Sequence, residues 1–323
     1  MNEMPGREPL PAPEVPDLSA DRHRELRDVF MQTITEQPQR TAARRRWALI
    51  IAPAATAAIA AAVVGAVALS GPKAGVAPVP GATEFVAPAT VAIAPAGAAG
   101  PLLERIAFTA STRPGTTVGA GKFVYVHSRV AWTGRVGDGP GKLDPVHDRE
   151  IWRPATKSVD GQFRENGEMV LLPDVVPNSA YADLPTDPDA LLRRVYAEGE
   201  ATFGKDDLSS PEDKAFQYLG EVLSESLLPP KVAAALYRAA ARIPGVERVD
   251  DAVDAAGRHG VAVGRVDPRG ERHEWIFDAR TFEFLGERSY LVRDTDLGKA
   301  GMLTGTTAVL KRGVVDKIGQ TPS

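Results

Sequence analysis

An uncharged run of apolar residues at 47–69, WALIIAPAATAAIAAAVVGAVAL, constrains this chain more than any other feature. A helix rises 1.5 Å per residue, so about 20 apolar residues cross the roughly 30 Å hydrocarbon core of a bilayer. Inside lipid, a helix also pairs every backbone N–H and C=O without help from water. The run is therefore predicted to be a single transmembrane helix.

Basic residues lie mainly before this run. Arg44, Arg45 and Arg46 precede it, and Trp47 stands where an interfacial aromatic anchor is expected, whereas Lys73 is the nearest basic residue after it. Because basic flanks stay on the cytoplasmic side, we expect the N-terminus in the cytoplasm and the C-terminus outside the cell membrane. The alternatives are a cleaved export signal, which would have an unusually long leading segment, and a buried helix of a soluble protein.

The predicted span divides the rest of the chain into three parts. Residues 1–46 form a cytoplasmic tail, in which 19–37 contain a short amphipathic helix with the apolar stripe Leu26, Val29, Phe30 and Ile34. Residues 70–100 are rich in Pro, Ala and Gly and predict an extended tether. Residues 101–323 are expected to form an extracytoplasmic domain.

Strand patterns and helix patterns occur in separate blocks along this outer segment. A helix is predicted from about Pro101. Period-two alternation predicts strands at 122–132, 149–154 and 162–172 before a helical block, and at 246–249, 261–266, 273–278, 282–293 and 304–312 after it. The three helices of the block begin at Asp187-Pro188, Ser210-Pro211 and Pro229-Pro230. The order favours an α+β fold, with about three helices on one side of a curved antiparallel sheet and one transmembrane helix preceding it.

Aromatic residues recur on the predicted strands. We expect one face of the sheet to carry Trp275, Phe277, Phe282 and Phe284, together with Phe123 and Tyr125. Such a face either lines a ligand cavity or forms the plain core beneath the helices, and the pattern leaves both open.

Composition excludes several classes of function. The chain of 323 residues has no cysteine, so disulfides, thiolate nucleophiles and cysteine zinc sites are absent. A formal net charge of −4 gives no reason to expect nucleic acid as a partner. The sequence contains no G-x-S-x-G elbow and no glycine-rich phosphate loop. We therefore predict no cofactor, no metal site and no catalytic residue.

Two groups of polar residues remain as candidates for hydrolytic chemistry. Asp250, Asp251 and Asp254 cluster, and paired acids hydrolyse glycosides when a cleft holds them in place. His127 and His273 alternate with apolar strand residues. The simpler interpretation is a solvated loop and ordinary strand histidines.

Several segments resemble an uncharacterised family of actinobacterial single-span envelope proteins. They are FVYVHSRVAW (123–132), LPTDPDALL (184–192), AGRHGVAVGRVD (256–267), WIFDARTFEFLGER (275–288), and DTDLGKAG with GTTAV (294–309). The resemblance implies no activity. It implies a role in envelope signalling only by association, since family members resemble products encoded beside sigma factors.

A second resemblance concerns the fold alone. The strand blocks around helices, with the strand–turn–strand WIFDARTFEFLGE, look like the curved half-barrel of lipoprotein carriers, which also occurs in envelope stress sensors. This resemblance implies a concave, apolar cavity of acyl-chain size beneath the helices.

Three functional hypotheses follow. The leading one is a membrane-anchored, non-enzymatic binding or sensor module of the cell envelope. It would bind a lipidic ligand or an envelope protein outside, and a cytoplasmic regulatory protein at residues 19–37. The others are a tethered envelope hydrolase and a structural spacer without a ligand.

Overall fold

The computed structural model describes residues 87–93, 97–135, 139–157, 159–204 and 209–322, which belong to one compact unit. The predictions made for the tail helix at 19–37, the span at 47–69, and its flank of Arg44, Arg45, Arg46 and Trp47 all lie outside these residues. Within the described ranges, no helix is long and apolar enough to cross a membrane.

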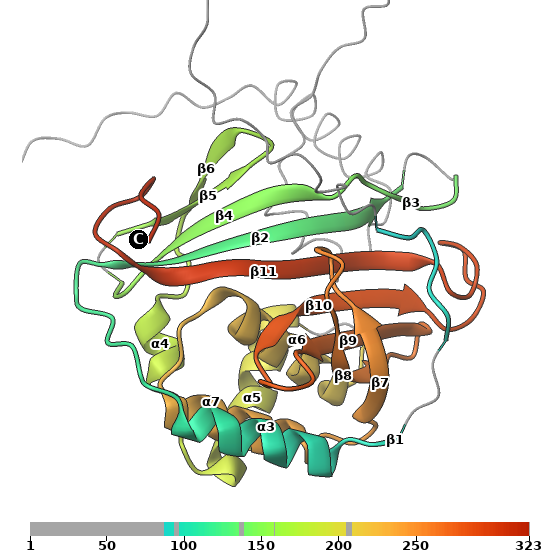
Figure 1. Ribbon diagram of the computed structural model, residues 1–323, viewed down its shortest axis with the longest axis horizontal. Coiled ribbons are helices and arrows are strands. Elements are labelled where there is room, and N and C mark those ends of the chain that lie inside the picture. Colours follow the sequence, from blue (N-terminus) through green and yellow to red (C-terminus); the bar gives the residue numbers. More distant parts are fainter. Residues whose placement is uncertain (1–86, 94–96, 136–138, 158, 205–208, 323) are drawn as a thin grey trace, which may run out of the picture. The chain divides into compact units, whose positions relative to one another are not determined.

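A single 11-stranded sheet, in which every pairing is antiparallel, forms the body of the domain (Figure 1). Its strands are β1 (Gly97–Ala98), β2 (Phe123–Gly134), β3 (Lys142–Leu143), β4 (His147–Pro154), β5 (Gly161–Glu165), β6 (Glu168–Leu172), β7 (Glu247–Val253), β8 (His259–Val266), β9 (Glu271–Phe277), β10 (Phe284–Leu291) and β11 (Leu303–Val315). The order across the sheet is β1-β7-β8-β9-β10-β11-β2-β4-β5-β6, and β3 pairs with β2 off this path. The long strands β11 and β2 therefore join an early block of strands to a late one.

Five helices are found in the described residues, where the sequence predicted about three packed on the sheet. They are α3 (Gly100–Thr112), α4 (Asn178–Ala182), α5 (Pro188–Phe203), α6 (Pro211–Glu225) and α7 (Pro230–Ala240). Local capping explains two of the starts. The Asp187 carboxylate accepts the amide of Ala190, and Ser210 and Asp213 form a reciprocal capping box.

The main core lies between one face of the sheet and the helices, which gather on that side (Figure 1). The sheet contributes Val124, Val126, Val263, Trp275, Phe277 and Val309, and the helices contribute residues such as Leu103, Phe216 and Leu236. Because strand residues alternate between faces, the neighbours of these residues point to the opposite side. Ile276 and Ala262, for example, belong to a separate cluster there. The prediction of an α+β fold with an antiparallel sheet is confirmed.

The single strand predicted at 162–172 is wrong. Residues 161–165 and 168–172 form the hairpin β5–β6, in which Glu165 pairs with Glu168. Asn166 and Gly167 make the turn, with φ angles of 51° and 81°. An Asn-Gly pair with two positive φ angles is the signature of a two-residue hairpin, so the turn was encoded in the sequence.

Residues 87–93, predicted to be part of a free tether, instead lie against the sheet. The Val91 amide donates to the Gly301 carbonyl (2.7 Å), and the Leu303 amide donates to the Ala89 carbonyl (3.0 Å). A few residues later, β1 pairs with β7 and forms the edge of the sheet. The packed domain therefore begins well before residue 101. We refer to residues 87–93 as the strap.

Candidate functional site: a pocket beneath the strap

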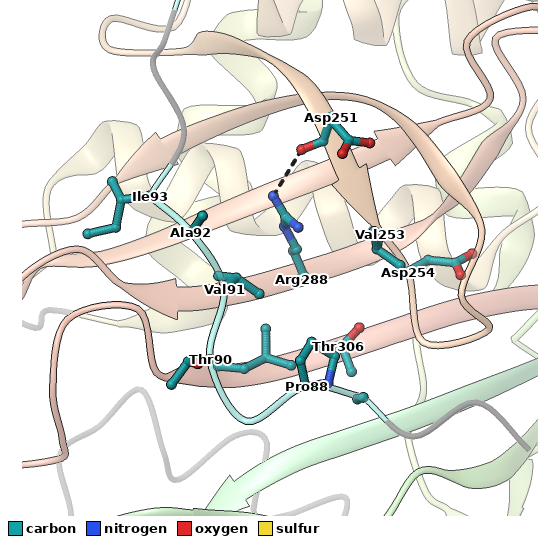
Figure 2. A pocket seen from close by; sticks show the side chains of 12 residues that line it. Pro88, Thr90, Val91, Ala92, Ile93, Asp251, Val253, Asp254, Arg288 and Thr306 are labelled. Atoms are coloured by element: carbon teal, nitrogen blue, oxygen red, sulfur yellow. Dashed lines mark hydrogen bonds between the residues drawn. The ribbon is translucent and has the colours of Figure 1, made fainter.

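A pocket of about 450 Å3 lies between the strap and the strands β7, β10 and β11 (Figure 2). It opens on the face of the sheet opposite the helices. The strand residue Glu287 lies beside Gly220 of α6, so its neighbour Arg288 points away from the helices and into the pocket. The lining residues are Ala87, Pro88, Thr90, Val91, Ala92, Ile93, Asp251, Val253, Asp254, Arg288, Leu303 and Thr306.

Arg288 is the buried cation of this pocket and is 7% exposed. Its Nε donates to Oε2 of Glu274 (2.6 Å), and its Nη2 reaches the Asp251 carbonyl at 3.4 Å (Figure 2). Glu274 is 1% exposed and also accepts the Tyr290 hydroxyl at Oε1 (3.0 Å). The guanidinium of Arg288 is thus held in place by contacts to β9 and β7 before any ligand enters.

A second arginine shares the Glu274 carboxylate. Arg272 Nε lies 3.1 Å from Oε1 of Glu274, and its Nη2 reaches the more exposed Glu247. Burial, followed by the neighbouring Glu274 carboxylate, raises the pKa of Tyr290 to about 12, so this hydroxyl keeps its proton and remains a donor. Two cations and one hydroxyl therefore converge on a single buried carboxylate beneath the pocket.

The acidic residues around the pocket are already engaged in structural contacts. The Asp251 carboxylate lies 2.8 Å from Nδ1 of His259. The buried Asp254 carboxylate accepts the amides of Ala256 and Arg258 and the Nε of Arg258 (2.7–2.9 Å). Asp250 is exposed and pairs with Arg248. Asp251 and Asp254 therefore both line the pocket, but each carboxylate is already paired, with His259 and Arg258 respectively.

The two candidate histidines are also far apart. His127 on β2 lies 3.0 Å from Asp148, on the same face as Tyr125. His273 lies on β9, on the helix side with Trp275, and β10 and β11 separate the two strands. Opposite faces and two intervening strands prevent the two imidazoles from meeting in one site.

Four of the aromatic candidates for a ligand cavity lie on the helix side. Phe216 of α6 stacks on Trp275 with ring centroids 4.0 Å apart, and Tyr237 of α7 meets Phe277 edge-on at 5.6 Å. Phe284 packs against Phe277. Phe282 is partly buried at the margin of this cluster, with the Arg105 guanidinium 4.8 Å above its ring. Helix side chains therefore cover Trp275 and Phe277.

The prediction that Phe123 and Tyr125 share this face is wrong. Both belong to a separate cluster with Trp152 and Val315, on the opposite side of the sheet from Val124 and Val126. The Tyr125 hydroxyl donates to Oε1 of Glu150 (2.7 Å), and burial raises its pKa. The six predicted cavity residues do not line one surface.

Comparisons with known proteins leave the family open. No known family and no curated protein matches the chain. The complex of MucA and MucB from Pseudomonas aeruginosa matches with a TM-score of 0.23 and 13% identity, covering 70% of this chain and 58% of that chain. An inactive mutant of the CurK dehydratase matches with a TM-score of 0.10 and 11% identity, covering 68% and 82%. Both TM-scores are too low to relate the folds, and neither match supports the resemblance to actinobacterial envelope proteins.

Proposed function

We propose that this protein is a membrane-anchored, non-enzymatic binding module of the cell envelope, with its ligand site in the pocket beneath the strap. In this proposal the run at 47–69 spans the membrane, residues 1–46 lie in the cytoplasm, and the described domain lies outside. The domain would use its sheet as a curved half-barrel scaffold. A cytoplasmic regulatory protein would bind the helix at 19–37.

One observation carries the proposal: the strap is both a wall of the pocket and part of the chain that leads back to the predicted span. It contributes Ala87, Pro88 and residues 90–93 to the lining, and backbone hydrogen bonds at Ala89 and Val91 hold it to the sheet. A ligand that contacts the strap would change the free energy of docking the strap. Occupancy would thereby alter how the tether leaves the domain.

We infer an amphipathic ligand such as a fatty acid, chiefly from the apolar wall, since the lining carboxylates of Asp251 and Asp254 are paired with His259 and Arg258. Most of the wall is apolar, with Val91, Ile93, Val253 and Leu303 among the contributors, while Arg288 supplies a fixed cation. Pockets that combine apolar walls with a few oriented polar groups are typical of small-molecule sites, and 450 Å3 lies within their usual range.

The ligand is tested by titrating the full chain, in detergent micelles, with a dansyl-labelled fatty acid. A Val253→Trp substitution puts an indole into the pocket and should abolish the saturable increase in dansyl fluorescence. The matched control is Val159→Trp, because Val159 is 53% exposed and does not line the pocket. Equal binding by both variants would show that the pocket is not the ligand site.

The topology is tested by labelling single cysteines, since the natural chain has none. In intact cells, a membrane-impermeant maleimide should label Ser323→Cys but label Ser19→Cys only after lysis. The opposite pattern would reverse the assignment of inside and outside.

The cytoplasmic half of the proposal has its own test. Deleting residues 19–37 should remove a protein that co-purifies with the full chain from membranes and leave fatty-acid binding unchanged. Identical sets of co-purifying proteins would remove the regulatory role while leaving the binding role intact.

A further inference from the structure

We propose that Asp267, Glu271 and His273 form a binding site for a divalent transition-metal cation, separate from the pocket beneath the strap. One ligand atom from each of these side chains lies within 4.8 Å of the others. Ligands of one tetrahedral ion with bonds of about 2.1 Å lie about 3.4 Å apart, so small side-chain rotations would bring the three onto a common ion.

The local backbone explains why the three side chains meet. Asp267 opens the turn between β8 and β9, where the Gly270 amide donates to the Asp267 carbonyl (3.0 Å) and Gly270 has a φ of +86°. The turn brings Glu271 opposite Asp267, because the Asp267 amide donates to the Glu271 carbonyl (2.8 Å). Glu271 and His273 are two residues apart on β9 and therefore share a face. The turn and the strand together thus bring the three side chains of the D-x3-E-x-H segment close to one another.

The His273 imidazole is the observation that points to a ligand. Its Nε2 is shielded from solvent and has no hydrogen-bond partner in the part of the chain that the structure describes. A shielded polar atom without a partner destabilises the folded state. A metal ion bound at this nitrogen would remove that penalty, since neutral imidazole is a common metal ligand.

The two carboxylates are oriented by outer partners, as metal ligands usually are. The Thr304 hydroxyl donates to Oε1 of Glu271 (2.5 Å). The Glu271 amide donates to Oδ1 of Asp267 (2.8 Å), and Arg269 Nε lies 3.0 Å from Oδ2. Each carboxylate oxygen has a second lone pair, so these contacts fix the Asp267 side chain and still leave it able to coordinate.

The donor set selects the class of ion. One imidazole and two carboxylates suit Zn2+ or Mn2+, whereas Ca2+ and Mg2+ bind through oxygen ligands alone. Three protein ligands would leave at least one coordination position for water or an exogenous ligand.

The test is isothermal titration of the untagged full chain, in detergent micelles, with Zn2+ at neutral pH. The wild type should show one saturable site, and His273→Ala and Glu271→Gln should each weaken it by at least about tenfold. The matched control is His259→Ala, because His259 is an exposed histidine outside this cluster and its loss should leave the affinity unchanged. The far-UV circular dichroism spectrum of each variant establishes that it folds.

A Co2+ titration of the wild type makes the result independent of the variants. The visible absorption bands of bound Co2+ should report a low coordination number with nitrogen and oxygen ligands, and Zn2+ should displace them. The absence of a saturable site in the wild type, or an affinity that His273→Ala and Glu271→Gln leave unchanged, would overturn the proposal.

Discussion

The C-terminal end of α6 is fastened to the sheet by buried charges that share one carboxylate. Arg153 Nη2 lies 2.6 Å from Oε2 of Glu225, and Arg149 Nη2 lies 3.6 Å from Oε1. Both guanidinium groups are buried. We predict that Glu225→Ala destabilises the domain strongly, because two buried cations lose their shared partner.

Removing one partner of a buried pair costs about 3–5 kcal/mol. Here the lower end is expected, since Arg153 keeps the Val176 carbonyl (2.6 Å) and Arg149 keeps a long contact to Glu165 (3.6 Å). For a domain of this size, about 3 kcal/mol corresponds to a fall in Tm of roughly 6–12 °C.

The assay is thermal unfolding of the full chain in detergent micelles, followed by tryptophan fluorescence. Glu104→Ala is the matched control, because Glu104 pairs with Arg238 on α7 but its side chain is 59% exposed. A pair at the surface contributes less than about 1 kcal/mol. Equal falls in Tm for Glu225→Ala and Glu104→Ala would refute the idea that buried charge fastens α6.

Three further outcomes are expected. Burial raises the pKa of Glu287 to about 8 from an ordinary 4.5, so the folded chain keeps a proton that the unfolded chain releases. The contribution of Glu287 to the free energy of unfolding therefore falls as the pH rises from about 4.5 to about 8, by at most about 1.4 kcal/mol per pH unit. In the Glu287→Gln variant, the denaturant concentration at the unfolding midpoint should change less across that pH range than in the wild type. Gly260→Ala should destabilise by about 1–3 kcal/mol in thermal unfolding, because its Cβ would meet the Phe277 carbonyl oxygen at 2.2 Å, while Gly97→Ala meets nothing within 4 Å and should be nearly silent. Cysteines placed at Thr90 and Met302, a bridged antiparallel pair, should form a disulfide that blocks fatty-acid binding until it is reduced, and binding by the oxidised form would mean that the strap need not move.

The helices were predictable because their signals are local. The Asp187 cap and the Ser210–Asp213 capping box each involve residues within four consecutive positions, and they start the helix at that place in the chain. The turn signal of the hairpin at Asn166-Gly167 is equally local, but period-two alternation continues on both sides of it and predicts one strand over 162–172. The strap carries no such signal. Its bonds to Gly301 and Leu303 are made by backbone groups, which composition does not report.

Which side chains meet at the candidate site depends on the register between strands, which the sequence does not show. Alternation places Phe123 and Tyr125 on one face of β2, but relating that face to Trp275 requires the order of the strands between them. A bulge at 309–311 in β11 then shifts the alternation along the strand that joins β2 to β10. The pairing of Glu274 with Arg288 has the same origin, since the two are cross-strand partners in β9 and β10.

The two faces of the sheet differ in what it costs to open them. On the helix side, a ligand that reached Trp275 and Phe277 would have to displace α6 or α7, and moving α6 means breaking a stacked aromatic pair and the buried contacts of Glu225. On the other side, the strap is held to residues 301 and 303 by two backbone hydrogen bonds, each contributing about 1 kcal/mol net. Apolar contacts of the strap add to this, but its Ile93 side chain is 48% exposed. Entry beneath the strap is therefore the less costly route. A ligand with modest affinity would suffice to shift the strap, whereas it would not suffice to expose the aromatic core.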